Sequence, residues 1–527
     1  MSDANFEKFI KENEIESLFK EKKHNEYVSR GIPENIINIL EKKKLKKEQI
    51  SRIENLPWES LGSKPDFADE CRAQKLLDEE HIGMDDVKDR IMDYYCSQFK
   101  NGATILLVGP PGVGKTSIAF QIAKACNRSA YKVSLSGIAS AHEIIGVDST
   151  FSDAAPGEII RAIENTGSFY PLVILDEIDK VGHSKEHGDP HNALLEVLDT
   201  NRENFRDRFL EIPIDLSNFI FIATANDLTD ISPILRDRLE IIEIGGYSKK
   251  LKKQIFTEQI IPKIALKLLG ESNDIFEIGD DAFERIINEY CIEPGIRELY
   301  DYADKMIRRA NRKNKHSFKK IYITAKDLEE YIGKPKIKYL AQYDANVIGS
   351  ANAAILASTK YARILKIHTE ILTDGVGEII CTGGIEGFAK ESVEVAKSLV
   401  RHYSNKLEIP SDYFLHKDIH VDSEYYPIIK NSSCIALAIF VSMVSTILEM
   451  PIPLSTMFAA KLRLDGSIEP VANIDEYIAI AIECNLKNVY ISAANVENDT
   501  ELIKKYDTIN IHPVKNIDGV LSEVFKI

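Results

Sequence analysis

Eight consecutive residues combine the side-chain types and the spacing that phosphate binding requires. Gly109 to Thr116 reads GPPGVGKT and fits the pattern G-x-x-x-x-G-K-[ST]. Glycines in such a loop let backbone N–H groups curl around phosphate oxygens, while Lys115 adds a mobile cation and the Thr116 hydroxyl can bind Mg²⁺. The candidate nucleotide-binding residues are therefore Gly109, Pro110, Pro111, Gly112, Val113, Gly114, Lys115, Thr116 and Ser117.

A loop of this kind needs a strand before it and a helix after it. The apolar run at residues 104–108 predicts the strand, and residues 117–125 predict the helix. The helix would present its positive N-terminus to the bound anion. This order of elements favours a nucleotide site over a chance glycine-rich turn.

Two carboxylates end a second apolar run. Residues 172–175 read LVIL and are followed by Asp176 and Glu177. Beside a phosphate-binding loop, Asp176 would hold Mg²⁺ indirectly, and Glu177 would orient or deprotonate the water that attacks the phosphate. The alternative is an ordinary polar strand end.

Polar residues also follow a third predicted strand, at residues 219–223. Asn226 could hydrogen-bond the γ-phosphate or the attacking water, although taken alone it would be interpreted as a turn residue. Arg236 and Arg238 follow in LRDRLE. One of them could reach a phosphate held by a neighbouring subunit, whereas such a pair by itself is usually a surface ion pair.

The composition is that of a globular chain with several cores. The 527 residues are 44% apolar and 28% charged, and the formal net charge of −16 disfavours a general nucleic-acid binder. Seven scattered cysteines form no metal-ligand pattern and are expected to be reduced thiols. No apolar run is long enough to span a membrane, and the acidic N-terminus does not resemble a signal or transit peptide, so a cytoplasmic location is expected.

Alternating helix and strand patterns predict an α/β fold in four parts. Residues 1–60 are expected to form a helical extension, in which the lysine run at 42–47 is a solvated helix face rather than a nucleic-acid contact. Residues 61–245 are expected to form a P-loop α/β domain, and residues 246–335 a helical lid. Residues 345–527 return to a mixed α/β pattern. Its expected strands are 365–372, 378–381, 418–421, 488–492 and 509–512, and its expected helices are 389–403 and 432–448.

From LPW at 56–58 to about Tyr331, the sequence resembles the AAA+ module of the Lon family. Beside the phosphate-binding loop, the match rests on LDEIDK at 175–180, NALLEVLD at 192–199 and LRDRLEIIEIGGY at 235–247. The resemblance implies a homohexameric ring that hydrolyses ATP with Mg²⁺ at subunit interfaces and threads polypeptides through a central pore. By motif, Arg238 matches the arginine finger, Arg297 the second sensor on the lid, and Phe151 the aromatic pore-loop residue that grips substrate. The alternative for Phe151 is a core residue of a loop.

The last part of the chain resembles the Lon peptidase domain, which uses a serine and a lysine. The likeness rests on TGGIEGFAKESVEVA at 382–396, KDIHV at 417–421 and INIHPVKNIDGVL at 509–521. The family's serine stretch, Pro-Lys-Asp-Gly-Pro-Ser-Ala-Gly, reads PIIKNSSC at 427–434 and places Ser432 at the serine. Its lysine stretch, Pro-Ile-Gly-Gly-Leu-Lys-Glu-Lys, reads PVANIDEY at 470–477 and places Asp475 at the lysine. The family's Thr-Gly-Glu reads AAK at 459–461, and the second histidine of its Asp-Ile-His-Val-His strand is Asp422.

These replacements predict that the peptidase chemistry is lost. A carboxylate is a poor base for a hydroxyl, and the loss of glycines stiffens the loop that lets N–H donors approach an oxyanion. Asn431 or Ser432 is instead expected to cap the helix that runs to Leu448. Rescue by Lys461 or Lys430 would need a shifted alignment. Family members also carry a large N-terminal substrate-recognition region, of which the sequence shows only about sixty residues before the matching segment.

The sequence therefore predicts an ATP-hydrolysing unfoldase or remodeller of the Lon type, acting on polypeptides in protein quality control, with a vestigial and inactive peptidase site. Two alternatives stay open. One is an active ATP-dependent serine endopeptidase that degrades misfolded proteins. The other is a nucleotide-held scaffold or regulatory subunit without motor activity. No membrane partner is expected, and nucleic acid is disfavoured.

Overall fold

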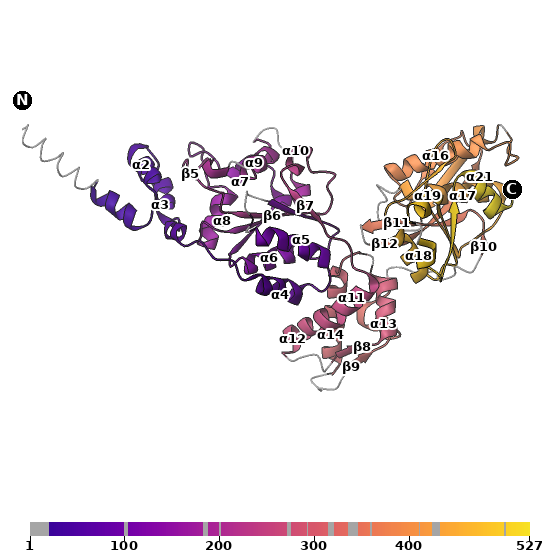
Figure 1. The fold of residues 1–527 in the computed structure, drawn as a ribbon, viewed down its shortest axis with the longest axis horizontal. Coiled ribbons are helices and arrows are strands. Elements are labelled where there is room, and N and C mark those ends of the chain that lie inside the picture. The colour runs from indigo at the N-terminus through magenta and orange to yellow at the C-terminus, as the bar shows by residue number, and fades with distance from the viewer. Residues whose placement is uncertain are drawn as a thin grey trace, which may run out of the picture. The chain divides into compact units, whose positions relative to one another are not determined.

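The chain forms two compact units, residues 1–244 and 245–527 (Figure 1). Within the described part of the chain, no helix is long and apolar enough to cross a membrane. The computed structural model describes residues 21–97, 99, 104–182, 188–199, 202–270, 276–291, 293–314, 321–335, 346–358, 361–410, 412–423, 433–499 and 502–527.

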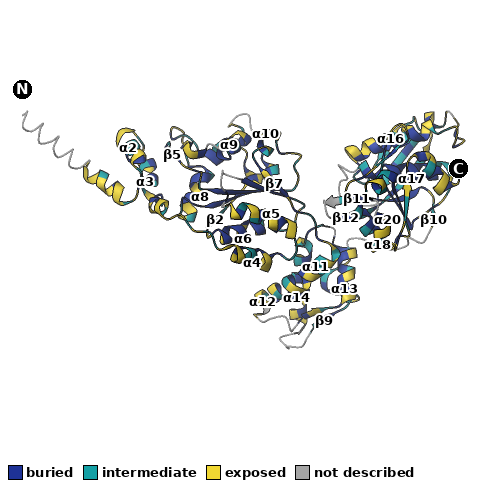
Figure 2. Cartoon of the chain, in the orientation of Figure 1, coloured by how far each residue is buried: buried dark blue, intermediate teal, exposed yellow. Residues whose placement is uncertain are grey.

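A five-stranded parallel sheet is the centre of the first unit. Its strands lie in the order β2 (Ala130–Ser134), β3 (Leu172–Asp176), β6 (Ile220–Ala225), β1 (Thr104–Val108) and β7 (Glu240–Glu243). The central strands are apolar along nearly their whole length because helices cover both faces, and Figure 2 shows them buried. Leu175 pairs with Ala223, and Val108 with Ala225, so three strands end at the same edge.

Short helices surround this sheet. The isoleucines of α8 (Glu158–Thr166) pack against alternate residues of the strands, such as Val173 and Phe221. The other helices are α4 (Glu70–Glu80), α5 (Asp85–Cys96), α6 (Lys115–Ala125), α7 (Ala141–Ile145), α9 (Pro190–Val197) and α10 (Pro233–Arg236), and β4 (Phe205–Arg206) pairs with β5 (Pro213–Ile214).

Helices precede the P-loop domain, as predicted: described residues 21–29 are helical, and α2 (Glu34–Lys42) and α3 (Lys47–Asn55) follow. Most of the lysine run lies in the link between them and not on a helix face. Lys43 forms an ion pair with Glu211, and Nζ of Lys46 donates to the carbonyl of Ser149. The expectation of a wholly solvated helix face is therefore wrong for these two lysines, because the link folds back onto the P-loop domain.

The first part of the second unit is mostly helical, which confirms the pattern expected for this region. A single-turn π-bulge at Phe256–Ile260 joins α11 (Lys249–Ile255) to α12 (Ile261–Leu269). One small parallel strand pair was not foreseen: β8 (Phe276–Ile278) with β9 (Ile321–Ile323). The remaining helices are α13 (Asp280–Arg285), α14 (Arg297–Asn314) and α15 (Leu328–Ile332).

A seven-stranded mixed sheet organises the rest of the second unit. Its strands lie in the order β13 (Ile379–Cys381), β14 (Lys417–Ser423), β12 (Tyr361–Thr373), β11 (Ser350–Ser358), β16 (Thr456–Ala459), β19 (Asn488–Ser492) and β20 (Asn510–Val514). β12 runs antiparallel to both neighbours, whereas β11, β16, β19 and β20 run parallel. Two small antiparallel pairs lie beside it: β10 (Asn346–Val347) with β15 (Ile452–Pro453), and β17 (Lys461–Leu462) with β18 (Ile468–Glu469).

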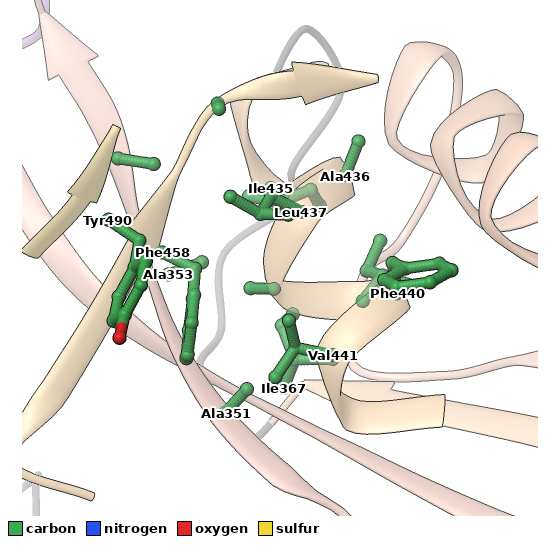
Figure 3. Packing of buried hydrophobic residues seen from close by; sticks show 14 of the residues in the cluster. Ala351, Ala353, Ile367, Ile435, Ala436, Leu437, Phe440, Val441, Phe458 and Tyr490 are labelled. Atoms are coloured by element: carbon green, nitrogen blue, oxygen red, sulfur yellow. The ribbon is translucent and has the colours of Figure 1, made fainter. Parts of the chain in front are cut away.

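Helix α17 (Ala436–Leu448) is the hydrophobic centre of this part. Every residue from Ala436 to Ser445 is buried, and Figure 3 shows Phe440 and Val441 of the helix with Ile367 of β12. The helix begins at Ala436, and a 3-10 turn at Ser433–Ile435 leads directly into it. Asn431 and Ser432, predicted to cap this helix, lie outside the described residues. The other helices are α16 (Phe388–His402), α18 (Ile474–Glu483), α19 (Ala493–Asn498), α20 (Leu502–Lys505) and α21 (Ile517–Val520).

Candidate nucleotide site and peptidase-like site

The phosphate-binding loop connects β1 to α6, as its pattern predicts. Gly112 and Gly114 have φ of 81° and 94°, the left-handed region that favours glycine. Gly109 lies so close to the next segment that a Cβ there would stand 2.1 Å from the carbonyl oxygen of Ile244. Three loop positions thus accept glycine alone, for two different physical reasons.

Lys115 points back over the loop. Its Nζ donates hydrogen bonds to the carbonyl of Gly109 at 2.6 Å, to that of Pro110 at 3.0 Å and to Oδ1 of Asn226 at 2.9 Å. Only 9% of the residue is exposed. Its ammonium group is therefore held where a phosphate in the loop would meet it.

Asp176, at the end of β3, collects three donors. Its Oδ1 accepts from Thr116 at 2.9 Å and from Thr224 at 2.6 Å, and its Oδ2 lies 2.5 Å from Nζ of Lys132. Burial raises the pKa of Asp176, but the hydrogen bonds from these three side chains outweigh burial and bring the pKa below its usual value. The carboxylate is ionised at neutral pH.

Glu177 adopts φ 59°, a conformation that turns the chain sharply at the strand end. Its backbone N–H donates to the Thr224 hydroxyl at 3.1 Å, and its carboxylate lies 2.8 Å from Nζ of Lys180. The hydrogen bond from Lys180 lowers the pKa of Glu177. The group is ionised and partly exposed, which are the properties needed to orient a water.

These residues fit a magnesium nucleotide. The Thr116 hydroxyl and an ionised Asp176 oxygen lie side by side, and hard oxygen ligands are what Mg²⁺ prefers. Thr116 would bind the ion and Asp176 would hold it through its water. The ammonium of Lys115 and the N-terminus of α6 supply the positive charge that a triphosphate needs.

Three further site residues were predicted from the sequence: Arg238, Arg297 and Phe151. Arg238 pairs with Asp199 at 3.0 Å, and its side chain is one-third exposed. Arg297 is the first residue of α14 in the second unit, so its relation to the loop is not described. Phe151 is 59% exposed in the loop between α7 and α8, so the alternative of a core residue is wrong.

Three residues of the cluster were missed from the sequence. Lys132 comes from β2, and Thr224 precedes Asn226 on β6. Asp179 accepts a hydrogen bond from the backbone N–H of Asn226 at 3.0 Å and so fixes that residue. Asp179 lies within the LDEIDK motif and could have been suspected, whereas the role of Lys132 depends on the order of the strands.

In the peptidase-like part, Asp475 lies in the first turn of α18. Its Oδ1 accepts from Nζ of Lys505 at 2.6 Å and from the hydroxyl of Tyr506 at 2.7 Å. Burial raises the pKa of Asp475, but these two hydrogen bonds outweigh it and lower the pKa. The hydrogen bond with Asp475 raises the pKa of Lys505, so this amine is held in its charged form.

Ser432 lies outside the described residues, whereas Cys434, two residues later in the chain, is described. The buried thiol of Cys434 donates to the carbonyl of Ala354 at 3.3 Å and accepts from the hydroxyl of Tyr477 at 3.3 Å. Burial raises the pKa values of both groups. The hydroxyl of Thr382 contacts His420 at 3.0 Å and also bonds Asp422.

Known families match both units. The family described as Lon protease (S16) C-terminal proteolytic domain matches residues 322–526, and the AAA family of ATPases associated with various cellular activities matches residues 105–246. The chain belongs to the Lon family. It combines the AAA P-loop domain with the Lon proteolytic domain, as the fold class predicted from sequence requires.

Several curated Lon proteins resemble this chain along most of its length. It is 37% identical over 457 residues to "Lon protease" of Fervidobacterium nodosum, covering 86% of this chain and 55% of that protein. It is 33% identical to "Lon protease 1" of Hydrogenovibrio crunogenus, covering 91% and 58%, and 31% identical to "Lon protease homolog, mitochondrial" of Caenorhabditis briggsae, covering 90% and 54%. The chain thus spans a little over half the length of these relatives.

Proposed function

We propose that this chain is an ATP-hydrolysing unfoldase or remodeller of polypeptides, whose peptidase-like site is inactive. The observation that carries the proposal is the cluster at the ends of β1, β3 and β6. There Lys115 contacts Asn226 while Thr116 and Thr224 contact Asp176. Ligands of α/β sheets bind at the carboxyl ends of the strands, where this cluster lies.

Each residue has a distinct task in this proposal. The loop and Lys115 bind the phosphates of ATP, and Glu177 orients the attacking water. Asn226 holds the γ-phosphate or that water, and Asp179 fixes its backbone. Mg²⁺, when bound through Thr116 and Asp176, supplies charge neutralisation on the phosphate oxygens. Arg238, from a neighbouring subunit, stabilises the charge that develops during transfer, and Arg297 senses the nucleotide from the lid.

The proposed loss of peptidase activity is supported by the contacts of Asp475. A serine–lysine site needs a neutral amine to remove the serine proton. The lysine position holds a carboxylate, and the amine that contacts this carboxylate, Lys505, is tied to it as an ion pair at 2.6 Å. A charged ammonium cannot accept a proton, so this pair does not replace the missing base.

Active peptidase function is the second candidate, favoured by the names of the relatives, each of which is called a Lon protease or its homologue. We further propose a homohexamer, with domains at 61–245, 246–335 and 345–527, located in the cytoplasm. The seven cysteines are free thiols, which is consistent with a reducing compartment.

The test is to incubate the protein with Mg-ATP and an unfolded client and to follow phosphate release and peptide release together. We expect phosphate release without peptide release, and Glu177→Gln should abolish the former. Ser432→Ala should change neither. Peptide release that Ser432→Ala removes would establish the second candidate, and absence of phosphate release would exclude the motor.

A further inference from the structure

The exposed ring of Phe151 projects from a loop whose two ends are fastened together. The loop runs from Gly146, at the end of α7, to Gly157, at the start of α8. The backbone N–H of Val147 donates to the carbonyl of Ala155 at 2.9 Å. A Cβ on Gly157 would stand 2.6 Å from the backbone nitrogen of Gly146, so the two ends touch.

A buried carboxylate ties this loop to a second segment. Oδ2 of Asp207 accepts from the N–H of Gly157 at 2.8 Å, while Oδ1 accepts from Phe209 and Leu210, each at 2.9 Å. The N–H of Arg208 donates to the carbonyl of Ile145 at 2.8 Å. Residues 207–210 therefore form the base on which the loop stands.

The α2–α3 hairpin contacts both the loop and its base. Lys46, in the link between the helices, donates through Nζ to the carbonyl of Ser149, two residues before Phe151. Gln49, which is only 1% exposed, donates through Nε2 to the carbonyl of Phe209 at 2.6 Å. Burying the Gln49 amide costs desolvation free energy, which its hydrogen bond to the carbonyl of Phe209 offsets.

Charged contacts flank these two hydrogen bonds. Lys43 pairs with Glu211, the residue directly after the base, and Arg52 pairs with Glu164 of α8 at 3.1 Å. The guanidinium of Arg52 also lies 5.9 Å from the centre of the Phe209 ring. The hairpin thus contacts the loop, its base and the helix that follows the loop.

We propose that the α2–α3 hairpin is a strut that sets the position of the Phe151 loop, with Lys46 and Gln49 as its positioning residues. The functional consequence rests on the proposed unfoldase function, in which Phe151 grips the client. The Phe151 ring can transmit force to a client polypeptide only if the loop that carries the ring is held in place. Loosening the strut should therefore uncouple client unfolding from ATP hydrolysis while leaving the nucleotide cluster intact.

The first test measures the loop directly and needs no activity. Phe151→Trp puts an indole at the exposed tip, and the emission of the single native tryptophan, Trp58, is subtracted using the unaltered protein. In this background, Lys46→Ala should lower the anisotropy of the loop tryptophan and increase its quenching by acrylamide. Lys44→Ala, an exposed lysine two residues earlier, is the matched control and should change neither. Equal anisotropy and equal acrylamide quenching in the Lys46→Ala and Lys44→Ala variants would overturn the proposed strut.

The second test measures coupling in the full-length protein with Mg-ATP and an unfolded client. Lys46→Ala should lower the client unfolding rate about three- to tenfold at an unchanged basal ATPase rate and an unchanged melting temperature. An unfolding rate equal to that of Lys44→Ala would overturn the positioning role. If the unaltered protein unfolds no client, the proposed function fails, and the anisotropy result still decides whether the strut exists. Gln49→Ala should act in the same direction, and the exposed Lys46 variant keeps the test valid should the Gln49 variant misfold.

Discussion

Nζ of Lys115 donates a 2.9 Å hydrogen bond to Oδ1 of Asn226, although 111 residues separate them in the chain. The contact exists because β6 pairs with β1 in parallel, and the two strands end together. A lysine at a helix N-terminus and an amide at a strand end thereby share one site. Asn226 is held from the other side by Asp179, so its amide is oriented before any nucleotide binds.

From this arrangement we expect Asn226→Ala to slow ATP hydrolysis more than it weakens ATP binding. Loss of one positioned polar group in a site of this kind typically costs about 100-fold or more in kcat. The substitution also leaves Lys115 with one hydrogen-bond partner fewer, so KM for ATP should change by about threefold or less. Steady-state phosphate release gives both numbers.

Asn165→Ala is the control for this prediction, because Asn165 bonds only within its own helix on an exposed face. A variant at Asn226 with unchanged kcat would show that the contact with Lys115 is structural.

Asp207 predicts an unusual pH dependence of stability. Burial, which its three backbone hydrogen bonds only partly offset, raises the pKa of Asp207 to about 6. Because the folded pKa lies above the ordinary value of 3.8, the folded state binds the proton more tightly than the unfolded state. The contribution of Asp207 to the free energy of unfolding is therefore largest below pH 3.8. It falls as pH rises toward about 6 and then stays constant, and the total change is up to about 3 kcal/mol.

The check is to compare the unaltered protein with Asp207→Asn by urea unfolding between about pH 4 and about pH 7. Emission from Trp58, which is buried and stacked on Phe169 at 4.9 Å, reports the first unit alone. Stability of the asparagine variant relative to the unaltered protein should rise with pH. Asp215→Asn, at an exposed turn, is the control, and a difference that does not vary with pH would contradict the raised pKa.

Much of this site could be predicted from sequence because the signals are local. The phosphate-binding loop, the acids after 172–175 and the amide after the third strand each follow an apolar run whose end marks the sheet edge. Strand 488–492 was predicted with its observed bounds, because β-branched and aromatic residues fill it. Helix 389–403 was displaced by a single residue at each end.

What could not be predicted depends on contacts between distant segments. Lys132 reaches Asp176 only because β2 and β3 are neighbours, and no local pattern states this. The lysine run was assigned to solvent because a charged segment is usually exposed, whereas tertiary contacts with Ser149 and Glu211 hold two of its members. Strand β11 was missed because alanine-rich segments have weak strand propensity, and its place between β12 and β16 determines its conformation.

We expect Asp475 and Lys505 to behave as a surface ion pair and not as a catalytic base and its partner. Both side chains are about half exposed, so a double-mutant cycle with Asp475→Ala and Lys505→Ala should give only a weak coupling free energy. Since the hydrogen bond lowers the pKa of Asp475, this coupling is present above about pH 4 and is lost as pH falls through the lowered pKa.

The same variants test for chemistry. Neither should change peptide release from an unfolded client, because a protonated amine at Lys505 cannot activate a hydroxyl. Loss of a measurable peptide-release activity in Lys505→Ala, with Lys504→Ala unaffected, would assign Lys505 a catalytic role instead.

The thiol of Cys434 should resist alkylation in the folded protein. It is buried, its hydrogen bonds to Ala354 and Tyr477 are internal, and burial raises its pKa, so little thiolate forms near pH 8. Cys71, exposed at the start of α4, provides a reference thiol in the same molecule. Iodoacetamide should label Cys71 at least about 100-fold faster than Cys434, as measured by peptide mass spectrometry, and denaturant should make the two labelling rates equal.

Rapid labelling of Cys434 without denaturant would mean that the peptidase-like site is open to solvent, and Tyr477→Phe should then change the labelling rate little. If the site is closed as described, Tyr477→Phe removes the hydrogen bond that lowers the pKa of the Cys434 thiol, so less thiolate forms and the labelling rate should fall further.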